Sequence, residues 1–120
     1  MSLPESLQLA QFTTMYRNLS AGVTGAVVKA APGHLHNMVV SNVGAVAVYV
    51  KLYDLAAAPT AANTPIYTVG IPAGWVQPLQ VENEPIVFLN GISLRATTGV
   101  ADADVAAPAA STCIINMGYK

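Results

Sequence analysis

The chain has 120 residues, of which 53% are hydrophobic and 9% charged, and its formal net charge is −1. This length suits a single domain, and the charged fraction is far below the roughly 25% of an average soluble domain. The five basic residues are scattered, which argues against a nucleic-acid surface, and the longest apolar run, near residues 44–50, is far shorter than the ~20 residues of a membrane helix.

The first segment, residues 1–20, is expected to be an N-terminal arm or a short helix, and the pattern does not choose between them. Its apolar side chains have no assigned place in the rest of the fold. We therefore expect Leu7, Leu9, Phe12 and Tyr16 to contact a neighbouring subunit.

Strand signals dominate residues 21–120, where Val, Ile, Thr and Tyr are frequent and Gly, Pro and Asn interrupt them at short intervals. Eight short strands at regular spacing predict an all-β, single-domain β-sandwich that resembles a jelly roll, although the strand order is left open and an immunoglobulin-like arrangement also fits. The predicted strands are residues 23–30, 34–42, 45–54, 65–71, 75–81, 86–89, 92–98 and 111–119.

The clearest alternation is in residues 45–54. Val46, Val48, Val50 and Leu52 share one face and should enter the core. The opposite face carries larger polar side chains, which we expect to be half-exposed or in contact with a partner; these are Tyr49, Lys51 and Tyr53.

Turn residues suggest how the strands connect. Asn42-Val43-Gly44 predicts a hairpin between the strands at 34–42 and 45–54, and Asn90-Gly91 predicts a second hairpin. Pro78 cannot donate a ladder hydrogen bond, so its strand should lie at a sheet edge or contain a bulge. We expect Trp75 and Phe88 in the core, and Cys113, which borders an apolar pair, as a buried and inert thiol.

Two long connections, residues 55–64 and 99–110, are rich in Ala and carry Pro. Small apolar side chains lose little entropy on ordering and allow another surface to approach closely. The loops either pack on their own domain or contact another subunit. Because low charge density favours association, we include Pro59, Asp102 and Asp104 among the candidate interface residues.

No catalytic motif is visible, and we expect no enzymatic activity, metal or cofactor. His34 and His36 share a face of a strand, as two zinc or copper ligands would, but nothing in the sequence ties Asp54, Glu82 or Glu84 to them as a third ligand. Surface or interface histidines on an alternating strand are therefore the favoured interpretation. Asp102 and Asp104 resemble part of a calcium loop, although a solvated pair of loop acids, or a turn in which an Asp caps a backbone N–H, is the better interpretation.

Several short motifs follow one another between residue 48 and the C-terminus. They are Lys51-Leu52-Tyr53, Ala58-Pro59-Thr60, Thr64-Pro65, Ile71-Pro72-Ala73-Gly74, Gly91-Ile92 and the loop at residues 96–104. In this order they resemble small virion structural proteins of tailed bacteriophages, a capsid decoration or cement-like β-sandwich family.

The resemblance implies a β-sandwich subunit on the exterior of the phage head, assembled in the host cytoplasm. The implied partners are the major capsid protein and further copies of the chain, as a homotrimer, with no direct contact to nucleic acid or membrane. An alternative is a receptor- or glycan-binding module associated with a head or tail fibre. A metal-dependent enzyme that uses His34 and His36 is the third hypothesis.

Overall fold

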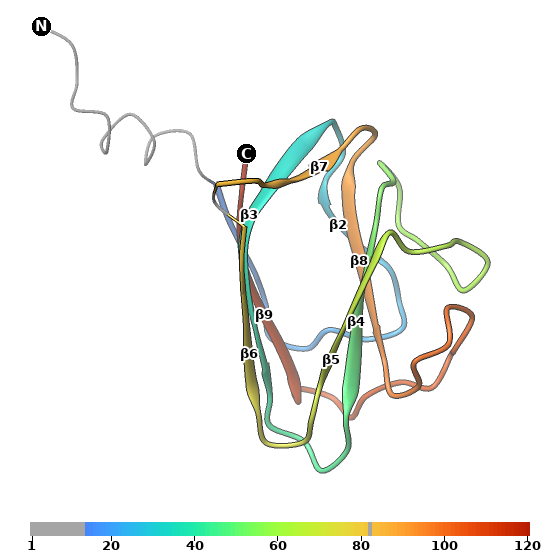
Figure 1. The fold of residues 1–120 in the computed structure, drawn as a ribbon. Coiled ribbons are helices and arrows are strands. Elements are labelled where there is room, and N and C mark those ends of the chain that lie inside the picture. The colour runs from blue at the N-terminus through green and yellow to red at the C-terminus, as the bar shows by residue number, and fades with distance from the viewer. Residues whose placement is uncertain (1–13, 82) are drawn as a thin grey trace, which may run out of the picture.

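A computed structural model of the chain describes residues 14–81 and 83–120, and its regular elements in this part are all β-strands (Figure 1). This confirms the predicted all-β class, and none of these residues forms a helix that is long and apolar enough to cross a membrane. The strands are β1 Thr14–Asn18, β2 Ala26–Lys29, β3 Gly33–Asn42, β4 Val48–Tyr53, β5 Tyr67–Ile71, β6 Val76–Gln80, β7 Ile86–Phe88, β8 Ile92–Thr97 and β9 Cys113–Tyr119.

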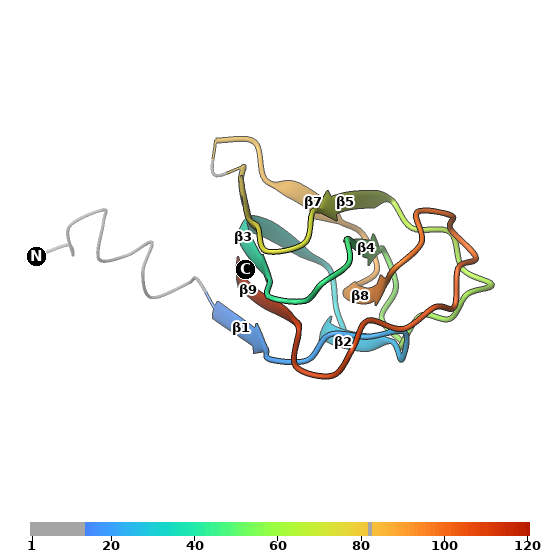
Figure 2. The same cartoon turned by 90° about the horizontal axis from the view of Figure 1, so that it is seen from below.

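The strands form two antiparallel sheets that pack face to face (Figure 2). Sheet A has the order β1-β9-β3-β6, with β7 also paired to β3, and sheet B has the order β2-β8-β4-β5. The pairs β1–β9, β2–β8, β3–β6/β7 and β4–β5 are successive steps of one long antiparallel ribbon, and these steps alternate between the sheets. This is the strand order of a jelly roll.

β6 and β7 behave as one interrupted edge strand. β6 pairs with residues 37–41 of β3, and β7 pairs with residues 33–35. At the interruption, β3 has a register shift between Leu35 and Asn37, and the amide of Val81 donates to the carbonyl oxygen of His36 at 3.0 Å. Pro78 lies in β6 at the sheet edge, as predicted, where a missing N–H donor is tolerated.

The core lies between the sheets and is built from alternate residues of each strand. β4 supplies Val48, Val50 and Leu52, each 1% exposed or less. Val46 precedes β4 and is 56% exposed, so its assignment to the core is wrong. Cys113 is buried as predicted, and burial raises the pKa of its thiol to about 11, which keeps the less reactive protonated form.

The predicted hairpins are wrong, because each of these connections crosses between the sheets. β3 and β7 belong to sheet A, whereas β4 and β8 belong to sheet B. Neither Asn90 nor Gly91 has the positive φ that a type I′ turn requires. Their amides instead donate to Oδ1 of Asp54, at 2.7 and 3.3 Å.

A buried asparagine holds two of the crossings together. The side-chain nitrogen of Asn42, 1% exposed, donates to the carbonyl oxygens of Val46 at 2.8 Å and Ile71 at 3.0 Å. Its side-chain oxygen accepts a bond from the amide of Gly44 at 3.0 Å. One side chain therefore joins the β3–β4 connection to the end of β5, where the chain leaves sheet B.

The predicted N-terminal arm, residues 1–20, extends too far along the chain. Residues 14–18 form β1, which pairs with β9 from Thr14–Tyr119 to Asn18–Ile115, so this part of the proposed arm belongs to the sandwich. Tyr16 is half-buried and packs against the core. Leu7, Leu9 and Phe12 lie outside the described residues.

Candidate functional site

The two Ala-rich loops lie over the outer face of sheet B, where they project from the sandwich (Figures 1 and 2). One loop, residues 54–66, joins β4 to β5, and the other, residues 98–112, joins β8 to β9. We call the two together the loop platform. The β4 and β8 side chains beneath it point away from the core, yet five of these six are buried: Lys51, Tyr53, Ser93, Arg95 and Thr97. The sixth, Tyr49, is half-buried.

Two cations lie opposite each other under the platform. The register of β4 and β8 pairs Lys51 with Arg95, and these side chains are 0% and 1% exposed. Like charges opposite each other on neighbouring strands are destabilising, and burial of a charge requires compensating hydrogen bonds. The platform backbone supplies many of these bonds.

Lys51 donates to the carbonyl oxygens of Gly99, at 3.3 Å, and of Ala101. Burial, followed by the positive charge of Arg95, lowers the pKa of Lys51 below its ordinary value, while Asp104 and Asp102 act in the opposite direction. The hydrogen bonds that compensate for burial of the Lys51 ammonium group therefore depend on the conformation of the loop after β8.

Arg95 connects three segments that are distant in sequence. Nε donates to the carbonyl oxygen of Val23 at 3.0 Å, and Nη1 donates to the hydroxyl of Tyr53 at 3.1 Å. Nη2 donates to the carbonyl oxygen of Asp104 at 2.8 Å. The rigid fork of a guanidinium can satisfy such acceptors together, so Arg95 fixes the loop after β8 to the segment before β2.

The loop after β8 is folded compactly on itself. Oδ1 of Asp104 accepts from the amide of Ala106 at 2.8 Å, which confirms the interpretation of an Asp that caps a backbone N–H. The hydroxyl of Thr97 donates to the carbonyl oxygen of Gly99 at 2.7 Å. A Cβ at Gly99 would lie 2.0 Å from Oδ2 of Asp104, so a larger residue here would have to displace this carboxylate.

The loop after β4 has its own internal bonds and a buried anchor. The amide of Thr60 donates to Oδ1 of Asn63 at 2.8 Å, and the amide of Asn63 donates to the carbonyl oxygen of Thr60 at 3.1 Å. Pro59 is buried against Gly25, where an added Cβ would lie 2.3 Å from the carbonyl oxygen of Pro59. An open pocket of about 360 Å³ lies between the segments; Val23, Pro59, Val105 and Arg95 are among its lining residues.

The structure thus separates the candidate interface residues into two groups. Tyr53 and Lys51 are buried by their own chain, so the expectation of a half-exposed contact face is wrong for them. Pro59 is buried, Asp104 is half-buried and Asp102 is exposed. The sequence did not identify Arg95, Gly25 and Gly99 as part of this site. For Arg95 a signal was visible, because Ser93, Arg95 and Thr97 alternate along their strand and therefore share one face of it.

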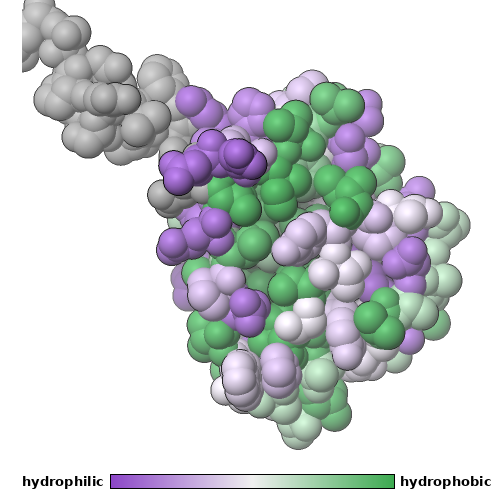
Figure 3. Space-filling view, viewed as in Figure 1, coloured by the Kyte–Doolittle hydropathy of each residue, from purple (hydrophilic) through white to green (hydrophobic). Residues whose placement is uncertain are grey.

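The exposed layer of the platform is almost uncharged. From the loop after β4 it presents Ala56, Ala57, Ala58, Thr60 and Ala62, and from the loop after β8 it presents Val100, Ala101, Asp102, Ala103, Val105, Ala106, Ala107, Ala109 and Ala110. In Figure 3 the right-hand side of the view is mostly pale, with few strongly hydrophilic side chains. Its large exposed aliphatic side chains are Val105, Val100 and Ile66, which are 68%, 63% and 49% exposed.

The histidine pair lies elsewhere, in β3 of sheet A. The rings of His34 and His36 meet edge to face with centroids 6.3 Å apart, and Nε2 of His36 is buried without a hydrogen-bond partner in the described part of the chain. Within residues 14–81 and 83–120, no group of three or more His, Cys, Asp or Glu side chains is placed to hold a metal ion.

Asp54 gives the platform a pH-dependent contact. Burial acts to raise the pKa of its carboxyl group, but hydrogen bonds from the amides of Asn90, Leu89 and Gly91 outweigh it and lower the pKa below 3.8. Because the pKa of Asp54 is lower in the folded chain, the stability that its ionised carboxylate contributes is complete above the pKa of the unfolded chain and is lost as pH falls through the folded value.

We expect the melting temperature of Asp54→Asn to fall less than that of the wild type between about pH 5 and pH 3, because the variant has no carboxylate to protonate. Equal acid slopes in thermal melts would contradict this.

Comparisons of the chain with protein-family models, curated proteins and solved structures find no match.

Proposed function

We propose that the chain is a non-enzymatic virion structural protein, a capsid decoration or cement subunit that stabilises a phage head through protein–protein contacts made by the loop platform. The proposed partners are the major capsid protein and further copies of the chain, with the homotrimer as the expected assembly. The observation that carries the proposal is the platform itself, an ordered and nearly uncharged surface anchored from below by Lys51 and Arg95.

Physical reasoning supports this use of the platform. A surface that is already ordered loses little conformational entropy when a partner covers it. Ala, Val and Thr side chains allow close approach, and one exposed acid, Asp102, leaves little charge to desolvate across the two loops. Repeated over a particle, modest contacts add up through multivalency.

A pair of matched substitutions tests the platform. Val105→Asp adds a charge at a side chain that is 68% exposed in the platform, whereas Val43→Asp makes the same change at a residue that is 63% exposed outside it. We expect Val105→Asp to weaken association by about tenfold or more, which corresponds to about 1.4 kcal/mol. Association is measured by sedimentation velocity of the chain and by co-sedimentation with phage heads that lack it.

The control variant, Val43→Asp, should associate like the wild type, and both variants should keep the wild-type circular dichroism spectrum. Equal binding by both variants would contradict a contact through the platform. A wild-type chain that is monomeric and does not bind heads would overturn the proposed function.

A second candidate function is favoured by one aromatic residue. Trp75 was expected in the core, but it is 60% exposed beside Val76, which is 59% exposed. Exposed aromatic rings stack on sugars, so a receptor- or glycan-binding module remains a proposal. It predicts glycan-array binding by the wild type that Trp75→Ala abolishes; the absence of any glycan binding by the wild type would remove this candidate.

A further inference from the structure

The four sheet edges of the described chain differ in how well they are protected against pairing with another strand. Natural proteins protect an edge with charges, proline, bulges or very short strands. β6 contains Pro78, and the edge breaks before β7. β2 has four residues, a register shift and Lys29, and β1 carries Arg17.

β5 has none of these protective features. Its sequence, Tyr-Thr-Val-Gly-Ile, contains no charge and no proline. Its pairing with β4 is continuous from Val48–Ile71 to Leu52–Tyr67, without a bulge. It ends sheet B in the described part of the chain, and it runs across the front of the molecule in Figure 1 with no element over it.

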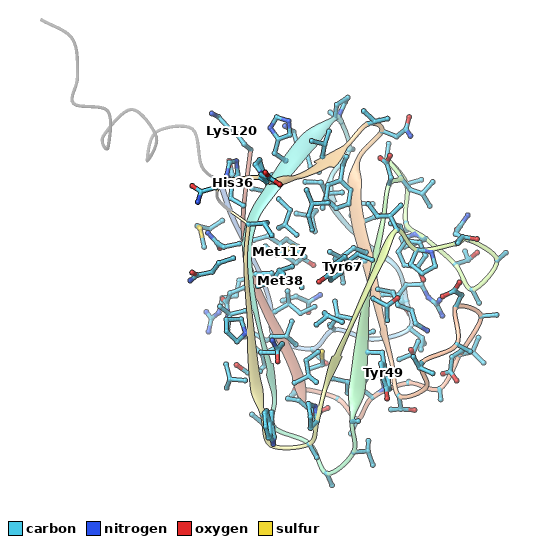
Figure 4. All side chains as sticks on the ribbon, in the orientation of Figure 1. His36, Met38, Tyr49, Tyr67, Met117 and Lys120 are labelled. Atoms are coloured by element: carbon cyan, nitrogen blue, oxygen red, sulfur yellow. The ribbon has the colours of Figure 1, made fainter. Side chains whose placement is uncertain are left out.

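The surroundings of β5 are apolar as well. Tyr67, 38% exposed, is on the same face as the core residues of sheet B, and Figure 4 shows it between the sheets near the open side of the sandwich. Ile66, immediately before the strand, is 49% exposed. Thr68 and Gly70 are exposed on the other face, where the ring of Tyr49 lies against Gly70.

We propose that β5 pairs antiparallel with β5 of a second copy of the chain, across a two-fold axis at Val69. An edge with free backbone donors and acceptors accepts an extended strand, and this sequence is suited to its own copy. With Val69 at the axis, Tyr67 lies opposite Ile71 of the second copy, and Thr68 lies opposite Gly70. No charged side chain of the strand meets another, and two four-stranded sheets become one continuous sheet.

Such a contact is isologous, because the same residues are used on both sides. It differs from the contacts of a homotrimer, which are heterologous, and it does not depend on a role in a virion. Val105, where the platform contact is tested, lies in the loop between β8 and β9, whereas Thr68 and Val69 lie in β5 itself, so the two contacts are tested by separate substitutions.

The first test uses matched charge substitutions on the full chain in sedimentation equilibrium. Thr68 is opposite Lys51 in its own sheet, so Thr68→Glu adds a carboxylate on each side of the axis without adding a repulsive charge inside the subunit, and Gln80→Glu makes a similar change on the exposed, protected edge strand β6. We expect the wild type to pair through β5, as a dimer or as paired trimers, with a dissociation constant that rises about tenfold or more in Thr68→Glu, because like charges across paired strands repel, and changes little in Gln80→Glu.

The second test uses cross-linking. Val69→Cys places two thiols at the axis, where antiparallel partners have Cα atoms about 4.5–5.5 Å apart, within the range of a disulfide. Mild oxidation should yield a covalent dimer from Val69→Cys and much less from Gln80→Cys, since the native Cys113 is buried.

A wild-type chain that forms neither a dimer nor paired trimers would overturn the proposal. So would pairing that Thr68→Glu leaves intact, or cross-linking at residue 69 that does not exceed cross-linking at residue 80, since both outcomes place the contact on another surface. A strand from a different protein on β5 would appear as a chain that does not pair with itself and whose binding of that protein is lost in Thr68→Glu, and this also overturns self-pairing.

Discussion

Arg95→Ala is expected to lower the free energy of unfolding by about 3 kcal/mol, among the largest effects of a single substitution in this chain. The change leaves the carbonyl oxygens of Val23 and Asp104 and the hydroxyl of Tyr53 without their donors. A buried polar group that loses its partner costs roughly 1–3 kcal/mol, and the space left by the side chain adds to this. Relief of the repulsion with Lys51 offsets part of the loss.

Urea denaturation measures this effect, with Arg17→Ala as the control. Arg17 is exposed in β1, so its removal should change stability by no more than about 0.5 kcal/mol. Arg95→Lys should recover little, because an ammonium group cannot reach three separated acceptors with the geometry of a guanidinium. If Arg95→Ala unfolds like the wild type, the loop does not depend on this cation.

Hydrogen exchange supplies an independent readout. Arg95 bonds to the loop after β8 and to the segment before β2, so amides in these two segments should lose protection before the sheets do. Amides of β3 and β9 in sheet A serve as the internal reference. Uniform loss of protection over both sheets would indicate global destabilisation without a specific role for the platform.

The strands were predictable because their signals are local. Alternation in residues 45–54 and 92–98 identifies β4 and β8, and Pro78 identifies an edge. The pairing of the strands depends on contacts that are distant in sequence, and turn residues do not determine which sheet the next strand joins. Asn90-Gly91 therefore suggested a hairpin where the chain crosses from sheet A to sheet B.

The sequence identified two strand residues of the candidate site, Lys51 and Tyr53, but not their burial. A polar outer face in a strand pattern does not reveal whether water or the chain's own loop covers it. Lys51 and Tyr53 were thus expected to be half-exposed, whereas the loop platform buries both. Arg95 was visible in its own strand, but only the β4–β8 register places it opposite Lys51.

The two interpretations of the Ala-rich loops concern different layers of these loops, and the contacts of the lower layer confirm packing on their own domain. Their lower layer packs on the domain through Pro59 and through the carbonyl groups that Lys51 and Arg95 bind. Their upper layer, which includes Val100 and Val105, remains exposed. Packing below orders the surface above, so the proposed contact with a partner depends on the integrity of the anchors.

Gly25→Ala tests this dependence and is expected to cost about 2 kcal/mol, as overpacking commonly does. A Cβ at Gly25 would lie 2.3 Å from the carbonyl oxygen and 2.7 Å from the nitrogen of Pro59, so the backbone of the loop after β4 must move. Gly22 belongs to the same segment but has no atom within 4 Å of an added Cβ. Gly22→Ala is therefore the matched control, with an expected change below about 0.5 kcal/mol.

The two glycine variants also separate stability from association. Because Gly25→Ala displaces the loop that carries Ala58 and Thr60, it should weaken association with phage heads even at temperatures where the β-sheet circular dichroism is that of the wild type. Gly22→Ala should bind like the wild type. If Gly25→Ala lowers the melting temperature but binds normally, the surface of this loop is not part of the contact, and the partner is bound by the loop after β8 alone or by another face. If it binds poorly while folded, the conformation set by Gly25 and Pro59 is what the partner recognises.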